Sequence, residues 1–158
     1  MKVRSDFVTN SSSSSFIVVF NSKKEYENRL ENMLKSGIDP EYASVIARDI
    51  GENRVTKEAA LKEIREALRD SFEFSYFYNG MGRYVPYSEQ LIIMKSKEFK
   101  DKCNAYVDKE MKLIEEKLPN RGYYASVIYG DDDGAFYSDL EHNIMPYQKF
   151  VIKQISHH

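Results

Sequence analysis

Residues 11–20, SSSSSFIVVF, place five serines directly before five apolar side chains. In an extended chain Phe16, Val18 and Phe20 point to one face and Ile17 and Val19 to the other, because side chains alternate along a strand. A strand that is apolar on both faces is typical of the middle of a covered sheet. We therefore predict a central strand over 15–20, with residues 1–14 as a serine-rich segment that leads into it.

Three helices are expected after this strand, and each begins at a side chain suited to cap a helix N-terminus. Ser22 with Glu25 forms a capping box, Asp39 precedes a proline, and Thr56 precedes a run in helical register. The expected helices cover 22–36, 39–51 and 56–70.

The second half of the chain has a different pattern. In 72–78, FEFSYFY, aromatic residues recur at every second position, which predicts a strand whose aromatic face joins the core. Stacking of nucleic-acid bases on that face is the alternative. A long helix is expected over 88–118, two strands over 123–129 and 135–138 joined by a hairpin at Asp133-Gly134, and a last strand over 149–155.

This order of elements predicts an α+β fold, because the helices group together and the last strands follow one another. We expect a single layer of mixed or antiparallel sheet with about four to five strands. A three-helix N-terminal group and one long helix pack on it. The 158 residues fit one domain, 1–158.

Composition limits the classes of function. The chain is 42% hydrophobic and 30% charged, with a net charge of -2, which is ordinary for a soluble globular protein. A pI near 6.0 gives no global attraction to phosphate backbones or anionic lipid, so non-specific nucleic-acid binding is not expected. No segment approaches the ~20 apolar residues that cross a bilayer, so no membrane association is expected either.

Cysteine usage indicates the compartment. Cys103 is the one cysteine of the chain, so no intramolecular disulfide can form and a reducing, cytoplasmic location is expected. Cys103 lies on the apolar seam of the long helix, which is typical of an inert core thiol.

The serine run has two interpretations. Runs of serine are typical of flexible spacers. Here Phe7-Val8 and the FIVVF strand flank the run, and its amides and hydroxyls could hold an anion at Ser11, Ser12 and Ser13. The glycines and lysine of a Walker motif are absent from it.

The histidines suggest a metal site. His142 follows Glu141, and His157 and His158 end the chain, where a terminal pair is also typical of a purification-tag remnant. If the pair is native, Glu141, His142, His157 and His158 can ligate a divalent metal, with Asp139 and the Asp131–Asp133 turn as further carboxylates. A solvated turn is the alternative for those aspartates.

Strand pairing decides whether these residues meet. If the 15–20 strand pairs antiparallel with the 149–155 strand, the serines lie beside Ser156, His157 and His158, whereas parallel pairing separates them. A Ser–His contact is the first geometric condition for nucleophilic catalysis, and two chain ends that cap each other would make the same contact. The candidate catalytic residues are Ser13, Ser14, Ser15, His142, His157 and His158.

The segment FVTNSSSSSF, residues 7–16, resembles an N-terminal signature of uncharacterised bacteriophage and bacterial proteins, some of which also end in a strand followed by Ser-His-His. Thr9 departs from the serine that is usual in the signature, and the hydroxyl is retained. The resemblance covers about a tenth of the chain. It implies a phage or mobile-element origin and no particular activity.

The sequence contains no complete constellation of nucleophile, base and orienting group. The leading hypothesis is therefore a macromolecule-binding accessory protein with a protein partner. The alternatives are a small hydrolase or transferase, metal-assisted in one version, and an anion- or nucleotide-binding sensor that uses the serine run.

Overall fold

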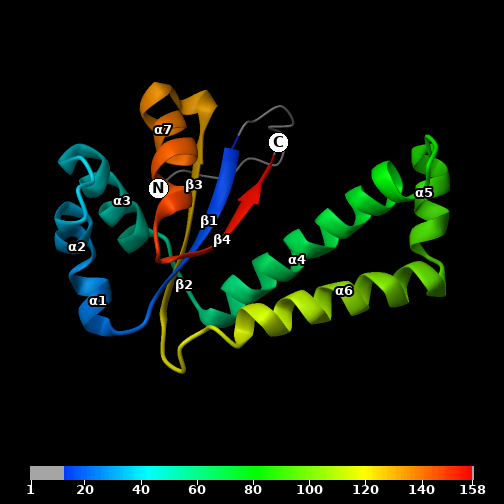
Figure 1. Ribbon diagram of the computed structural model, residues 1–158, viewed down its shortest axis with the longest axis horizontal. Coiled ribbons are helices and arrows are strands. Elements are labelled where there is room, and N and C mark those ends of the chain that lie inside the picture. The colour runs from blue at the N-terminus through cyan, green and yellow to red at the C-terminus, as the bar shows by residue number, and fades with distance from the viewer. Residues whose placement is uncertain (1–12, 158) are drawn as a thin grey trace. The chain divides into compact units, whose positions relative to one another are not determined.

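The computed structural model describes residues 13–157, which form two compact units (Figure 1). The first unit extends to Leu61, resumes at Leu118 and contains the sheet. The second unit, Lys62–Lys117, is helical. The assignment of 1–158 to one domain stays a prediction.

The sheet of the first unit has four strands in the order β2-β3-β1-β4, and every pair is antiparallel. β1 lies between two neighbours, which confirms the central strand and the α+β single-sheet fold. Its strands are β1 (Ser13–Phe20), β2 (Arg54–Val55), β3 (Tyr123–Gly130) and β4 (Val151–Ser156).

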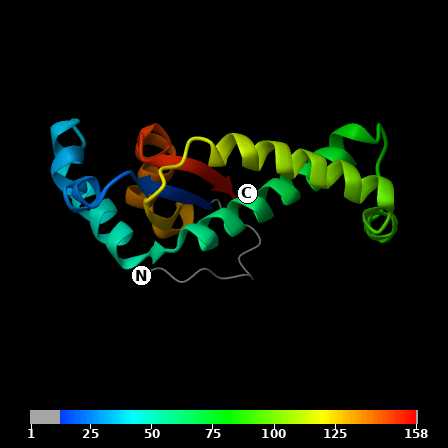
Figure 2. The ribbon, with the colours of Figure 1, turned by 90° about the horizontal axis from the view of Figure 1, so that it is seen from below.

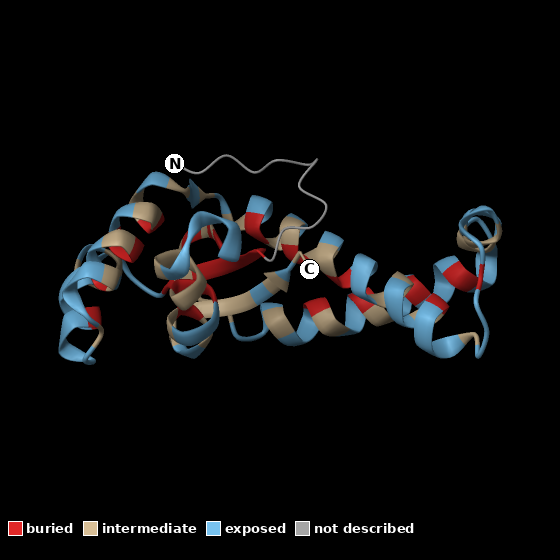
Figure 3. Cartoon of the chain, turned by 90° about the horizontal axis from the view of Figure 1, so that it is seen from above, coloured by how far each residue is buried: buried red, intermediate tan, exposed pale blue. Residues whose placement is uncertain are grey.

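The core cluster of the first unit lies on the face of the sheet from which Phe16 and Val18 project. Figure 3 shows buried residues in the strands and in the neighbouring helices. Phe16, Val18 and Phe20 project from β1 into this core, while Ile17 projects to the other face and is equally buried. The core cluster consists of Phe16, Val18, Phe20, Met33, Ala43, Ile46, Ala47, Ile50, Ala125, Val127, Tyr129, Leu140 and Met145.

The N-terminal helices begin where the capping residues predict. The Ser22 hydroxyl accepts from the Glu25 amide at 3.1 Å, and the Asp39 carboxylate accepts from the Glu41 amide at 2.9 Å. The first predicted helix divides at Asn28, a residue of modest helix propensity. The helices are α1 (Lys23–Glu27), α2 (Arg29–Lys35) and α3 (Pro40–Glu52).

The strand predicted over 72–78 is wrong. These residues continue α4 (Lys57–Ser75) and a π-helical turn, η1 (Tyr76–Gly80). No glycine or proline interrupts the chain between Thr56 and Gly80, so the helix that Thr56 caps extends to that glycine. The long helix predicted over 88–118 is two helices, α5 (Tyr87–Met94) and α6 (Lys97–Glu115), because Ser96 is extended and caps the second.

The strand predicted over 135–138 is also wrong. After η2 (Asp131–Asp133) and Gly134, whose φ is +104°, the chain forms α7 (Ala135–Asp139), η3 (Leu140–Ile144) and η4 (Met145–Tyr147). Phe136, Leu140 and Ile144 recur at helical spacing and pack in or against the core cluster. Burial of this stripe favours a helix over a hairpin strand.

The second unit contains α5, α6 and most of α4. Figure 2 shows α5 beyond the C-terminal end of α4 and the N-terminal end of α6. Aromatic rings join the two long helices, because Phe72 of α4 lies 5.5 Å from Phe99 and 5.7 Å from Tyr106 of α6. None of the helices within 13–157 combines the length and the apolar character that membrane crossing requires.

Candidate functional site

β1 begins, and β3 and β4 end, at the same end of the sheet. The first residue of β1, Ser13, pairs with Gly130 at the end of β3, and Ser14 pairs with Ser156 at the end of β4. The His157 amide continues the ladder and donates to the Ser13 carbonyl at 2.8 Å. The serines therefore lie beside the C-terminal strand, and the antiparallel pairing is confirmed.

Ser15 and His157 are in direct contact. The Ser15 hydroxyl lies 2.8 Å from Nε2 of His157. Ser15 is fully buried within β1, so its hydroxyl is not accessible to a substrate in this structure. The geometry thus joins a serine and an imidazole, while the burial favours an orienting hydrogen bond over a nucleophile.

The other serines of β1 are buried as well. Ser14 is fully buried and its hydroxyl accepts from the Gln154 amide group at 3.3 Å, and Ser13 is 7% exposed. The predicted strand start at residue 15 is thus two residues late. Ser11 and Ser12, candidates for anion binding, and His158, a candidate for catalysis and metal binding, lie outside the described residues.

A second group of side chains surrounds His142. Its Nε2 lies 3.1 Å from Oδ1 of Asp131 and 2.8 Å from Oε1 of Glu141. Ligand atoms of the three residues all lie within 4.8 Å of one another. Glu141 is fully buried, whereas the side chains of Asp131 and His142 are 41% and 45% exposed. We name Asp131, Glu141 and His142 the D-E-H cluster.

Local structure explains how the D-E-H cluster forms. Asp131 is the first residue after β3, and Glu141 and His142 lie in η3, whose Leu140 packs in the core cluster. The core contacts of Leu140 thereby hold the next two residues against the end of β3.

The predicted metal ligands divide into two groups. Glu141 and His142 meet with Asp131, while His157 contacts Ser15 on the other face of the sheet, since Ser15 alternates with the core residue Phe16. Asp139 joins neither group, because its carboxylate accepts from the Tyr42 hydroxyl and the Asn143 amide group. These two hydrogen bonds lower the pKa of Asp139.

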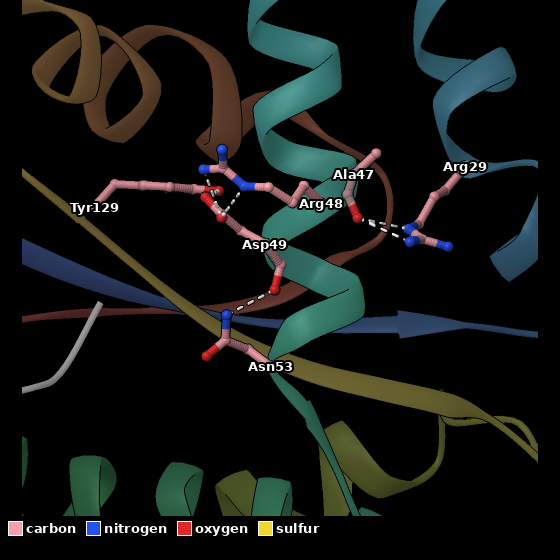
Figure 4. A network of polar contacts seen from close by, with 6 residues as sticks. All are labelled: Arg29, Ala47, Arg48, Asp49, Asn53 and Tyr129. Atoms are coloured by element: carbon pink, nitrogen blue, oxygen red, sulfur yellow. Dashed lines mark hydrogen bonds and ion pairs between the residues drawn. The ribbon is translucent and has the colours of Figure 1, made fainter. Parts of the chain in front are cut away.

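A polar network attaches α3 to its neighbours (Figure 4). The Tyr129 hydroxyl donates to Asp49 at 2.9 Å, and Arg48 pairs with the other oxygen of that carboxylate at 3.0 Å. On the opposite side of the helix, Arg29 donates twice to the Ala47 carbonyl, at 3.0 and 2.8 Å. The network fixes α3 between α2 and β3.

Replacement of Tyr129 by phenylalanine is expected to cost about 1.5–3 kcal/mol at neutral pH, the value of a hydrogen bond to a charged group. Burial, followed by the charge of Asp49, raises the pKa of Tyr129 far above its ordinary value. Folding therefore favours the protonated phenol, and this stabilisation is complete below about pH 10 and declines at higher pH. Denaturant titrations between about pH 9 and pH 11 should show a shallower loss of stability in Tyr129→Phe. An unchanged slope would contradict this assignment.

The second unit carries an unusual number of exposed apolar side chains between residues 74 and 92. Of ten exposed large hydrophobic residues among 13–157, six lie in this stretch at the end of α4, in the following loop and in α5. We name them the tip patch: Phe74 (61% exposed), Tyr78 (63%), Tyr84 (81%), Tyr87 (70%), Leu91 (40%) and Ile92 (72%).

The helical geometry explains why two of the five aromatics in 72–78, Phe74 and Tyr78, are exposed. Phe72 and Tyr76, one turn apart, lie against Phe99 of α6. Phe74 and Tyr78 project elsewhere and stack on each other at 4.7 Å. The predicted single core face is therefore wrong for Phe74 and Tyr78, since alternate residues share one face of a strand but not of a helix.

Residues 74–92, which we name the tip segment, carry no net charge. Arg83 and Glu89 are its two ionised residues, and their side chains form an ion pair.

Elsewhere in the second unit Cys103 is buried in α6, where burial raises the pKa of its thiol. The prediction of a core thiol is confirmed.

Comparison of the chain with protein-family models, with curated proteins and with solved structures finds no match.

Proposed function

We propose that this chain is a macromolecule-binding accessory protein that docks a protein partner on the tip patch. The observation that carries the proposal is the concentration of six exposed large apolar residues between 74 and 92. Exposed apolar surface is unfavourable in water, and its concentration in one segment is typical of a binding site.

The composition of the tip patch suits a protein interface. Tyrosine and phenylalanine are enriched in the cores of interfaces, because they bury a large area with few rotatable bonds. The pre-formed stack of Phe74 on Tyr78 further reduces the entropy that binding would cost.

The charge of the tip segment narrows the partner class. Nucleic-acid binding depends on lysine and arginine contacts to phosphates, and the one arginine of this segment is paired with Glu89. Anionic membranes attract polybasic segments for the same electrostatic reason. The partner that we propose is therefore a protein with an apolar groove. Non-specific binding of nucleic acid is not part of the proposal.

The origin and the cellular compartment of the protein are also part of the proposal. The resemblance of residues 7–16 to a bacteriophage and bacterial signature supports a phage or mobile-element origin. A single, buried cysteine supports a reducing, cytoplasmic environment.

Catalysis by the serines receives less support. Ser13, Ser14 and Ser15 are strand residues that are at most 7% exposed, and a nucleophile must reach its substrate. Every residue of the tip patch, in contrast, is exposed.

Site-specific photo-crosslinking tests the proposal. A benzophenone amino acid replaces Tyr84 in one sample and Tyr147 in the other, and both are irradiated in native host cells. Tyr147 is the matched control, because it is 77% exposed and lies outside the tip segment. We expect a discrete protein adduct from position 84 and none from position 147. The absence of an adduct at 84, or the same adducts from both positions, would overturn the proposal.

A further inference from the structure

We infer that the D-E-H cluster is a binding site for a divalent first-row transition-metal ion. Asp131, Glu141 and His142 supply two carboxylates and one imidazole. The site belongs to the first unit, is separate from the tip patch and does not depend on the proposed function.

The spacing of the donor atoms matches a coordination sphere. Metal–ligand distances for these donors are about 2.0–2.2 Å, so neighbouring ligand atoms of one ion lie about 3.0–3.5 Å apart. Nε2 of His142 lies 3.1 Å from the Asp131 oxygen and 2.8 Å from the Glu141 oxygen. All three ligand atoms lie within 4.8 Å of one another, so side-chain shifts would bring them around one ion.

Burial of Glu141 gives an independent argument. It is the one charged side chain that is fully buried within residues 13–157, and a second carboxylate, Asp131, lies beside it. A dication bound between the two carboxylates would be attracted to both at once, and this attraction is stronger where solvent is excluded.

Access and ligand count are also consistent with an exchangeable ion. Asp131 and His142 are partly exposed, so the cluster opens to water on one side while Glu141 closes the other. Three protein ligands leave at least one coordination position for water or a bound ligand. The imidazole favours Zn²⁺ over Mg²⁺ and Ca²⁺, which prefer oxygen donors, and the two carboxylates suit Mn²⁺ as well.

Titration of the full chain with Mn²⁺, followed by the paramagnetic resonance signal of the free ion, tests this site. We expect one bound Mn²⁺ per chain, displaced by Zn²⁺ and not by an equal concentration of Mg²⁺. Asp131→Asn, Glu141→Gln and His142→Ala should each weaken binding by at least the roughly 10- to 100-fold that loss of outer-shell partners costs at metal sites.

Two controls keep the test specific. Asp132→Asn removes the same charge from the same turn, and His157→Ala with His158→Ala removes the other imidazoles that could bind metal. Both should leave Mn²⁺ affinity unchanged, and thermal unfolding shows whether each variant is folded. The inference is overturned if the chain binds neither ion. It is also overturned if Asp132→Asn weakens binding as much as Asp131→Asn, or if the terminal histidines account for all binding.

Discussion

Phe16→Ala is expected to lower the free energy of unfolding by about 3–5 kcal/mol, the range measured for removal of a buried phenylalanine. Phe16 is fully buried in the middle strand and lies 6.3 Å from the ring of Tyr129 on the next strand. β1 is paired with a strand on each side, so the cavity left by the substitution cannot close by movement of an edge strand. Urea unfolding monitored by circular dichroism measures the change.

Phe74→Ala is the matched control, because it removes the same side chain from a site that is 61% exposed. Surface substitutions of this kind change stability by about 0.5 kcal/mol or less. A small effect at Phe74 would mean that this ring is dispensable for folding, as expected of a binding residue. Comparable losses in the two variants would contradict the assignment of Phe16 to the core and Phe74 to the surface.

The features that the sequence predicts well are those set by local chemistry. The apolar run 16–20 identifies the central strand, because both of its faces require cover. Ser22, Asp39 and Thr56 identify helix starts, because each accepts a hydrogen bond from an amide that the helix leaves unpaired. These signals need only a few neighbouring residues.

The features that it predicts poorly depend on packing. Aromatics at 72, 74, 76 and 78 fit a strand period, yet the same four residues form two i, i+4 pairs on a helix. Likewise, Asp133-Gly134 fits a hairpin turn, but Phe136, Leu140 and Ile144 bury a helical stripe instead. In both cases the longer helical pattern prevails over a shorter strand signal.

The candidate sites were predictable in part. Glu141 and His142 adjoin in sequence, and antiparallel pairing of the terminal strands brings His157 to Ser15. Asp131 was predicted only as one carboxylate of the Asp131–Asp133 turn. Its contact with His142 depends on η2 and η3, which the hairpin prediction did not include. The exposure of Phe74 and Tyr78 follows from the helical register of 72–80, which the strand prediction missed.

Replacement of three tip residues should remove most of the affinity for the partner. The variant combines Tyr84→Gln, Tyr87→Gln and Ile92→Gln, whose wild-type side chains are each at least 70% exposed. Glutamine is a good helix former, so α5 should persist. Interface hot spots cost at least about 2 kcal/mol each, which corresponds to about 30-fold in affinity.

The control variant replaces three other exposed apolar residues, Leu34, Leu113 and Tyr147, by glutamine. It lowers surface hydrophobicity by the same number of side chains without a change in the tip patch. Any general effect of surface apolarity on recovery of the protein would therefore affect both variants alike.

Calorimetric titration of the partner identified by crosslinking, with wild type and both variants, tests the central claim most directly. The account predicts that the tip variant loses at least about 30-fold of its affinity, while the control variant stays within about threefold of wild type. A folded tip variant that binds as tightly as wild type would contradict it.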